Sequence, residues 1–133
     1  MAMLEENFGP FEKKAEEQVS PLTLAYIGDA FYEIIVRTVL VRQADRSVNK
    51  LHRAASALVK AEKQSEMIGI LEPMLTDAEQ EVYHRGRNAK SYTKAKNASI
   101  VDYRRATGFE AVMGYLFLKG EISRAVELIR KSI

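Results

Sequence analysis

The sequence predicts an all-α fold of about six or seven helices, in a single domain spanning residues 1–133. Three observations predict it. Serine or threonine residues of the kind that cap helices precede long segments without internal proline. No run of four to eight residues alternates convincingly between apolar and polar side chains, as a half-buried strand does. The chain is 47% hydrophobic and 29% charged, so its 133 residues can form one compact core but leave no room for a second domain.

Residues 1–19 form an acidic N-terminal segment, whereas a secretory signal or transit peptide would be basic or apolar. The apolar stretches of the chain are all shorter than the ~20 residues that a membrane span needs. We therefore expect a cytoplasmic protein without a membrane segment. The charged residues of the N-terminal segment are Glu5, Glu6, Glu12, Glu16 and Glu17 against Lys13 and Lys14.

Capping signals give the order of the first helices. Ser20 followed by Pro21 predicts a helix from residue 21 to about residue 43. Ser47 is the expected cap of a helix that runs to about residue 71, with a break near Lys60 as an open alternative. Pro73 ends this stretch, because the residue before a proline disfavours helical backbone.

The second half of the chain holds the remaining helices. Residues 76–79 match a capping box, which predicts a helix to about His84. Residues 85–97 combine glycine, asparagine and many cations without a sustained period, and we expect a loop there. Ser99 starts a helix that runs through residue 118 and stops at Gly120. Residues 121–131 form a short amphipathic helix.

The helix expected over residues 21–43 is apolar nearly all round, so it should lie centrally. Asp29, Glu33 and Arg37 nevertheless draw a charged stripe along one of its apolar sides, at i, i+4 and i+8. Burying a carboxylate without a partner costs several kcal/mol or forces its protonation. We therefore expect a cationic group nearby. The Glu33–Arg37 pair itself is interpreted as an ordinary salt bridge rather than catalytic machinery.

Glu110 is a second acid on a helical face of core-type residues. Gly28 and Gly114 each cost their helix roughly 1 kcal/mol relative to alanine, which is easiest to understand if the two helices cross closely there. Such a crossing would bring Asp29 and Glu110 together. Two converging carboxylates make an oxygen-ligand site suited to Mg²⁺ or Mn²⁺.

Composition excludes several other kinds of site. The chain has no cysteine, which excludes thiol catalysis, cysteine-ligated zinc and iron–sulfur clusters. Its two histidines, His52 and His84, lie far apart and form no zinc-binding pattern, so neither is assigned a role.

The segment from residue 85 to residue 105 is strongly basic. Its seven Lys and Arg residues face the single acid Asp102, a local charge of +6 in a chain of net charge +2. Such a segment can bind nucleic acid by releasing counterions from phosphate. A merely solvated segment and an acidic protein partner remain alternatives. The residues expected to bind RNA are Arg85, Arg87, Asn88, Lys90, Lys94 and Lys96.

Three motifs in order resemble the ribonuclease III family. The run LAYIGDAFYE at residues 24–33 resembles the family signature, and TGFEAVMGYLFL at residues 107–118 resembles its second acidic helix. Between them, RGRNAK at residues 85–90 is similar to the basic loop of the Mini-ribonuclease III branch. This branch consists of the catalytic domain alone. The chain length agrees, because nothing remains after Ile133 to form a double-stranded-RNA-binding domain.

The resemblance implies a Mg²⁺-dependent endoribonuclease that cleaves double-stranded RNA and leaves a 5′-phosphate and a 3′-hydroxyl. Asp29 falls on the catalytic aspartate of the family and Glu110 on its metal-binding glutamate. Other members carry further acids where this chain has Ala25, Leu22 and Thr107. Two protein carboxylates per site, completed by water and the scissile phosphate, are therefore expected.

The resemblance also implies a homodimer whose paired sites cut opposite strands, and apolar faces on both acidic helices favour such an assembly. The implied substrate is the precursor of bacterial large-subunit (23S) ribosomal RNA, with a ribosomal protein assisting. A non-catalytic RNA-binding module of the same fold is the alternative function. A helical interaction protein with an acidic partner is a third reading.

Overall fold

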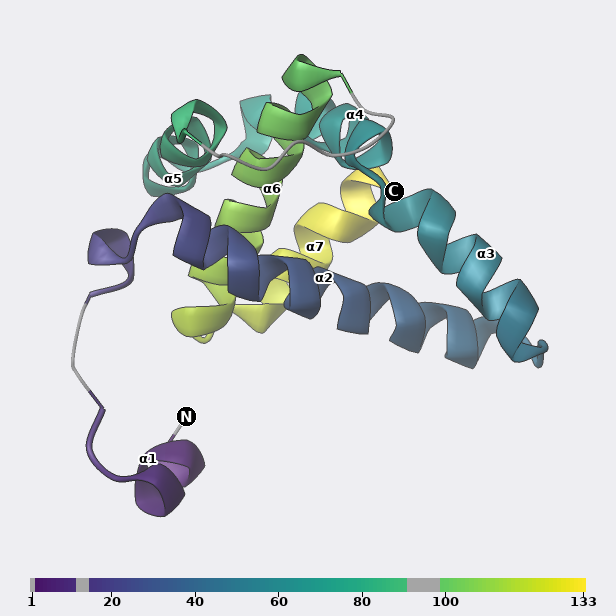
Figure 1. Ribbon diagram of the computed structural model, residues 1–133, viewed down its shortest axis with the longest axis horizontal. Helices are drawn as coiled ribbons and strands as arrows, with labels where there is room; N and C mark the ends of the chain where they lie inside the picture. The colour runs from purple at the N-terminus through teal and green to yellow at the C-terminus, as the bar shows by residue number, and fades with distance from the viewer. Residues whose placement is uncertain (1, 12–14, 91–98) are drawn as a thin grey trace.

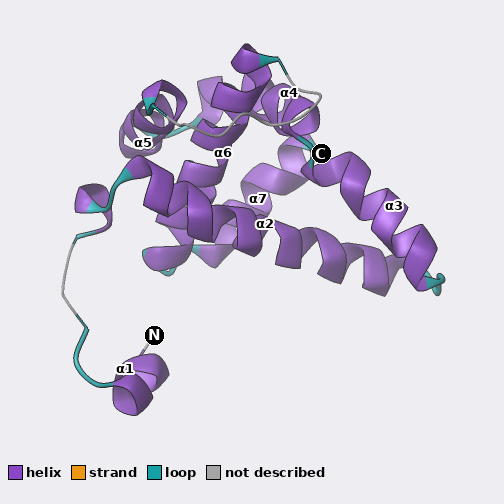
Figure 2. Ribbon diagram, viewed as in Figure 1, coloured by secondary structure: helices purple, strands orange, loops and turns teal. Residues whose placement is uncertain are grey.

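The computed structural model describes residues 2–11, 15–90 and 99–133. Across these residues the chain forms α-helices and short 3₁₀ turns and no strand, which confirms the expected all-α class (Figure 2). The seven α-helices of the described residues and their two 3₁₀ turns are α1 (Ala2–Phe8), η1 (Glu16–Gln18), α2 (Pro21–Gln43), α3 (Val48–Val59), α4 (Ala61–Leu71), η2 (Glu72–Met74), α5 (Asp77–Asn88), α6 (Ile100–Leu118) and α7 (Ile122–Ser132).

The helix starts follow the predicted caps. The hydroxyls of Ser20, Ser47 and Ser99 each accept a hydrogen bond from the backbone N–H three residues later, at 3.2, 3.3 and 3.0 Å. Such bonds satisfy donors that a helix start otherwise leaves open. The break near Lys60 is confirmed, because that residue is extended between α3 and α4. Gly120 follows α6 with a φ of +80°, the left-handed backbone expected after a helix end.

The loop expected over residues 85–97 is wrong in its first part, because α5 continues to Asn88. Gly86 is the reason. A Cβ atom built there would lie 2.9 Å from the Cβ of Ala111 and 2.9 Å from the Cα of Gly108. The glycine that suggested a loop therefore allows α5 to pack closely against α6.

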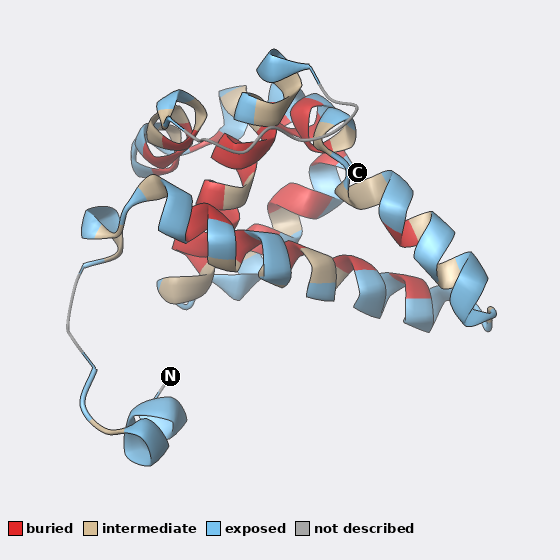
Figure 3. Cartoon of the chain, viewed as in Figure 1, coloured by how far each residue is buried: buried red, intermediate tan, exposed pale blue. Residues whose placement is uncertain are grey.

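Helix α6 occupies the centre of the molecule. Figure 1 shows it running between α5 and α4, with α2 crossing it, and Figure 3 shows its middle turns buried. Every residue from Ala106 to Leu116 except the half-buried Glu110 is buried. Helix α1 lies apart from this body, and all of its residues are exposed.

Helix α2 is less central than its composition predicts. Leu24, Tyr32 and Leu40 lie on its buried face, which packs against α6 and α3. Its opposite face leaves Tyr26 82% exposed and Ile34 63% exposed. The apolar surface of α2 therefore exceeds what the remainder of the chain covers.

An ion pair fixes α7 to the start of α5. Glu79 is buried and forms the predicted capping box, in which its carboxylate accepts from the Thr76 N–H at 2.9 Å. The Arg124 guanidinium donates to both carboxylate oxygens of Glu79, at 3.0 and 2.9 Å, and to the carbonyl of Met74 at 2.9 Å. One arginine thus joins α7, η2 and α5.

No helix within the described parts of the chain is sufficiently long and apolar to span a bilayer.

Candidate active site

The candidate site is built where α2 and α6 cross. A Cβ atom on Gly28 would lie 1.8 Å from the carbonyl oxygen of Glu110, and one on Gly114 would lie 1.9 Å from the carbonyl oxygen of Leu24. Only glycine permits backbones to approach so closely. The predicted crossing is therefore confirmed, and it places Asp29 of α2 beside Glu110 of α6.

The two carboxyl groups interact directly. Burial, repulsion from Asp29 and a hydrogen bond that the protonated group donates to Asp29 together raise the pKa of Glu110 from 4.5 to about 9. The charge of Glu33 adds to the increase. Asp29 itself is exposed. The pair thus joins one exposed acid with one half-buried acid, and both would be stabilised as anions by a nearby cation.

Gln64 is a site residue that the sequence analysis missed. This α4 side chain is 1% exposed, and its amide nitrogen donates to Glu110 Oε2 at 3.5 Å and to the carbonyl of Val59 at 3.1 Å. Its hydrogen bond lowers the pKa of Glu110, opposing the larger effects of burial and Asp29. A signal was present, because Gln64 shares a helical face with the buried residues Met67 and Leu71.

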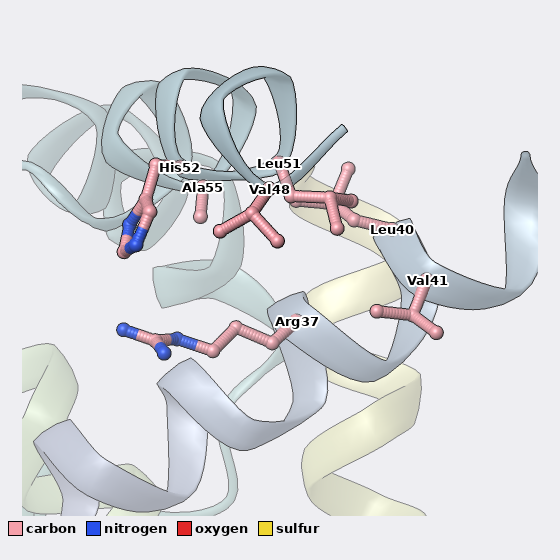
Figure 4. A pocket seen from close by; sticks show the side chains of 7 residues that line it. All are labelled: Arg37, Leu40, Val41, Val48, Leu51, His52 and Ala55. Atoms are coloured by element: carbon pink, nitrogen blue, oxygen red, sulfur yellow. The ribbon is translucent and has the colours of Figure 1, made fainter. Parts of the chain in front are cut away.

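Farther along α2, Arg37 donates to Glu33 at 3.1 Å, which confirms the predicted salt bridge. A hollow of about 180 Å³ follows between α2 and α3. In Figure 4 the Arg37 guanidinium and the His52 imidazole lie at the same end of this hollow, and its remaining walls are apolar. Neither Asp29 nor Glu110 lines it. The hollow is therefore separate from the carboxylate pair.

The candidate site offers only oxygen ligands to a metal ion. Within residues 2–11, 15–90 and 99–133, no group of three or more His, Cys, Asp or Glu side chains is arranged to hold a metal ion. Asp29 and Glu110 offer two carboxylates without a nitrogen or sulfur ligand. Such a set fits Mg²⁺ or Mn²⁺, which prefer oxygen ligands, and Mg²⁺ commonly retains several waters.

Arg85, one of the predicted RNA-binding residues, contacts the segment before α2. Its guanidinium donates to the carbonyl of Glu17 at 2.8 Å. The Glu17 carboxylate in turn accepts a hydrogen bond from the Tyr115 hydroxyl at 3.2 Å. Arg85 and Tyr115 therefore hold the segment around η1 against α5 and α6.

Arg87 and Asn88 lie at the end of α5. The Arg87 guanidinium is 5.6 Å from the centre of the Tyr83 ring, and its Nε donates to Asn88 Oδ1 at 3.3 Å. Asn88 and Lys90 are exposed. The remaining predicted RNA-binding residues, Lys94 and Lys96, lie outside the described residues.

Comparison with known proteins gives a consistent set of relatives. Residues 22–121 match the model of the Ribonuclease III domain. The chain is 50% identical to Mini-ribonuclease 3 of Clostridium tetani over 121 residues, covering 90% of this chain and 80% of the relative. It is 41% identical to Mini-ribonuclease 3 of a Thermoanaerobacter species over 128 residues, covering 96% and 90%.

A crystal structure of a Fusobacterium nucleatum protein has the same fold. It superposes with a TM-score of 0.80 at 24% sequence identity, covering 89% of this chain and 94% of that chain. The helices described above are therefore a shared arrangement.

Proposed function

The chain belongs to the ribonuclease III family, among its Mini-ribonuclease 3 members, and from this premise we propose that it is a metal-dependent endoribonuclease that cleaves double-stranded RNA. The meeting of Asp29 and Glu110 at the glycine crossing carries the proposal. The acids come from segments far apart in sequence and converge at the two motifs that resemble the family. A purely structural pair of repelling carboxylates would destabilise the fold.

Asp29 and Glu110 are the catalytic residues in this proposal and would hold Mg²⁺, or Mn²⁺ in its place. The bound ion supplies the positive charge that activates water and neutralises the phosphodiester during hydrolysis. Asp29 provides the solvated ligand. Glu110 must lose its proton to act as the second, and the amide of Gln64 assists by donating to the carboxylate. The products would be a 5′-phosphate and a 3′-hydroxyl.

RNA binding is assigned to the basic residues that follow the core of α5. Arg87, Asn88 and Lys90 lie together at the end of that helix, and Lys94 and Lys96 continue the segment in sequence. Arg85 contributes positive charge while its guanidinium is bonded to Glu17. We propose that the substrate is the large-subunit ribosomal RNA precursor in the cytoplasm, that a ribosomal protein assists, and that residues 1–133 are one catalytic domain.

A homodimer is part of the proposal. Tyr26, Ile34 and Val41 lie on the outer face of α2 and are 82%, 63% and 61% exposed. Large apolar side chains exposed on one helix face favour an interaction site there. A second copy of the chain, related by a two-fold axis, would cover this face and bring a second Asp29–Glu110 pair to the opposite RNA strand.

Cleavage of duplex RNA in the presence of Mg²⁺ tests the function. The wild-type protein should cut, and Asp29→Asn should reduce the rate by about 100-fold or more, because the charge of one metal ligand is lost. The control is Asp45→Asn, which removes the same charge from an exposed residue outside the site. Circular dichroism should be unchanged in both variants. Retained cleavage by Asp29→Asn would contradict the site.

A non-catalytic RNA-binding module is the second candidate. Two residues favour it. The side chain of Ala25 has no atom that could bind a metal ion, and the hydroxyl of Thr107 donates to the carbonyl of Tyr103 within its own helix, at 2.9 Å. Neither supplies the additional acid of other family members. Duplex RNA binding without cleavage, unaffected by Mg²⁺, would establish this alternative.

A further inference from the structure

A cavity of about 580 Å³ lies between the end of α4, the end of α5 and the first turns of α6. Figure 1 shows α5 and α4 on opposite sides of the N-terminal half of α6. All of the residues that line the cavity belong to the described part of the chain. Asp29, Glu33, Gln64 and Glu110 are not among them. The cavity is therefore separate from the carboxylate pair, and its volume lies within the range of small-molecule sites.

The walls of the cavity are cationic. Arg87, Arg104 and Arg105 line it, and Glu72 is the single acid that does so. Among the described residues, no carboxylate lies within ion-pairing distance of the three guanidinium groups. Three like charges around one cavity repel each other, so an anion between them would be stabilised.

Two of the guanidinium groups are held in place by their surroundings. The Arg105 side chain is half-buried and lies across Gly69 of α4, where an added Cβ atom would be 2.6 Å from its Nη2. The absence of a side chain at Gly69 creates the space that this guanidinium occupies. The Arg87 guanidinium lies over the ring of Tyr83. Groups that are positioned before binding lose less entropy when a ligand arrives.

One further donor lines the same cavity. Tyr83 also belongs to the lining, but it is fully buried and its hydroxyl is closed off from solvent, so we count only its ring as part of the wall. Asn88 accepts from Arg87 through its oxygen, which leaves its amide nitrogen as another donor. The cavity thus presents three guanidinium groups and one amide as donors, against one carboxylate.

We propose that this cavity binds a phosphate group between Arg87, Arg104 and Arg105. The two parallel N–H donors of a guanidinium group match two oxygens of a phosphate, whereas the ammonium group of a lysine acts as a point charge. This difference explains why the cavity is lined by three arginines. The phosphate belongs to a nucleic acid strand or to a free phosphate compound, and the recognising chemistry is the same in both cases. Binding requires neither Asp29 nor Glu110, so it is independent of cleavage.

Calorimetric titration of the metal-free protein with inorganic pyrophosphate tests the free-phosphate source. The wild type should bind saturably, and Arg104→Gln with Arg105→Gln should weaken binding by about tenfold or more, because two forks are lost. The matched control removes two charges at the exposed end of α7, by Arg130→Gln with Lys131→Gln, and should bind as the wild type does. Equal weakening by the control would show general charge attraction and overturn the proposal.

A short RNA duplex tests the nucleic acid source, again without metal so that no cleavage occurs. The slope of the logarithm of the binding constant against the logarithm of the salt concentration should become shallower in the Arg104/Arg105 variant, by the equivalent of about two phosphate contacts. It should stay unchanged in the Arg130/Lys131 control. If the salt slope changes in this way but pyrophosphate does not bind, the occupant is an RNA phosphate. If the wild type does not bind pyrophosphate and the Arg104/Arg105 variant keeps the wild-type salt slope, the site is refuted.

Gly69→Leu separates the cavity from its charge. The new side chain occupies the space of the Arg105 guanidinium without changing the net charge, and the only atoms near its Cβ are those of this guanidinium. We expect the same loss of phosphate affinity with an unchanged fold. Wild-type affinity in Gly69→Leu would show that the ligand binds elsewhere.

Discussion

Glu110 is the residue on which the candidate site depends most. It is the half-buried member of the pair, and burial and Asp29 both favour its neutral form. Gln64 is the neighbour that acts in the opposite direction, because its amide donates to the carboxylate from α4. A ligand that must be ionised to bind a cation therefore has its ionisation assisted by one buried amide.

Replacing Gln64 by Met tests this role. The variant retains the volume of the side chain but removes the donor, so the pKa of Glu110 should rise further. The Mg²⁺ concentration at half-maximal cleavage at pH 7 should increase by about tenfold. The deficit should shrink as the pH rises above 9, because Glu110 then ionises in the wild type and, at still higher pH, in the variant. Gln43→Met, at the exposed end of α2, is the control, and an unchanged Mg²⁺ requirement in Gln64→Met would contradict the role.

The sequence was sufficient to predict that Asp29 and Glu110 meet. Each acid lies near a glycine within its helix, and a close crossing of the two helices accounts for both glycines. The sequence was not sufficient for Gln64. Gln64 is a neutral amide on a short helix, so nothing in its charge indicates a site. Its importance depends on the packing of α4 against α6, which is a long-range contact. Whether Asp29 and Glu110 are catalytic remains a prediction.

At the scale of helices, the crossing of α2 and α6 depends on two residues without side chains. Gly28→Ala would place a methyl group 1.8 Å from the backbone oxygen of Glu110, so the helices must separate. We expect the free energy of unfolding to fall by about 3 kcal/mol, the upper range for overpacked cores. Urea denaturation measures this.

Gly69→Ala provides the control for that substitution. Gly69 is also helical, but its added methyl group would meet only the end of the Arg105 side chain. The helix propensity of alanine should make this variant equal to or up to about 1 kcal/mol more stable than the wild type. Equal behaviour of the two alanine variants would show that the crossing is not close in solution.

The joint between α5 and α7 should make stability depend on pH. Burial alone would raise the pKa of Glu79, but hydrogen bonds from Arg124 and Thr76 and the arginine charge outweigh it and lower the pKa below 4.5. The stabilisation is therefore complete above the unfolded-state pKa and is lost as the pH falls through the lower folded-state pKa. Glu79→Gln should cost about 2 kcal/mol at pH 7.

The same variant identifies the group responsible. Its deficit relative to the wild type should decrease below about pH 4.5, because Glu79 becomes protonated in the wild type as well. Chemical denaturation at pH 7 and at pH 3 gives both differences. A deficit of equal size at the two pH values would assign it to the hydrogen bonds that the new amide group cannot accept rather than to the lost charge.

Helix starts were predictable because caps are local, as Ser20, Ser47 and Ser99 illustrate. The end of α5 was not. Gly86 has the same identity whether it terminates a helix or permits a close contact, and only the presence of Gly108 and Ala111 opposite it decides between these roles. Local sequence therefore predicts where a helix begins better than where tertiary packing prolongs it.

For the whole molecule, the sequence predicted more apolar surface than one chain can cover, on both acidic helices, but not which of the two would keep it exposed. Helix α6 takes the central position, since α2, α4, α5 and α7 pack around it. Helix α2 therefore keeps an apolar face in solvent, with Ile34 and Tyr26 on it. Which of the two apolar helices is enclosed depends on which other helices pack against it, and composition does not contain that information.

Ile34→Glu tests whether a second copy covers this face. If two chains meet there, a carboxylate at the interface without a partner should disrupt the dimer, because desolvating it costs several kcal/mol. Light scattering should then give twice 15.0 kDa for the wild type and 15.0 kDa for the variant. The control is Val126→Glu, an exposed apolar position on α7, which should remain dimeric. Because one subunit carries one carboxylate pair, the monomeric variant should lose coordinated cutting of the two strands of a duplex. A wild type of 15.0 kDa at every concentration would exclude the dimer and leave the Asp29–Glu110 site to be judged by cleavage alone.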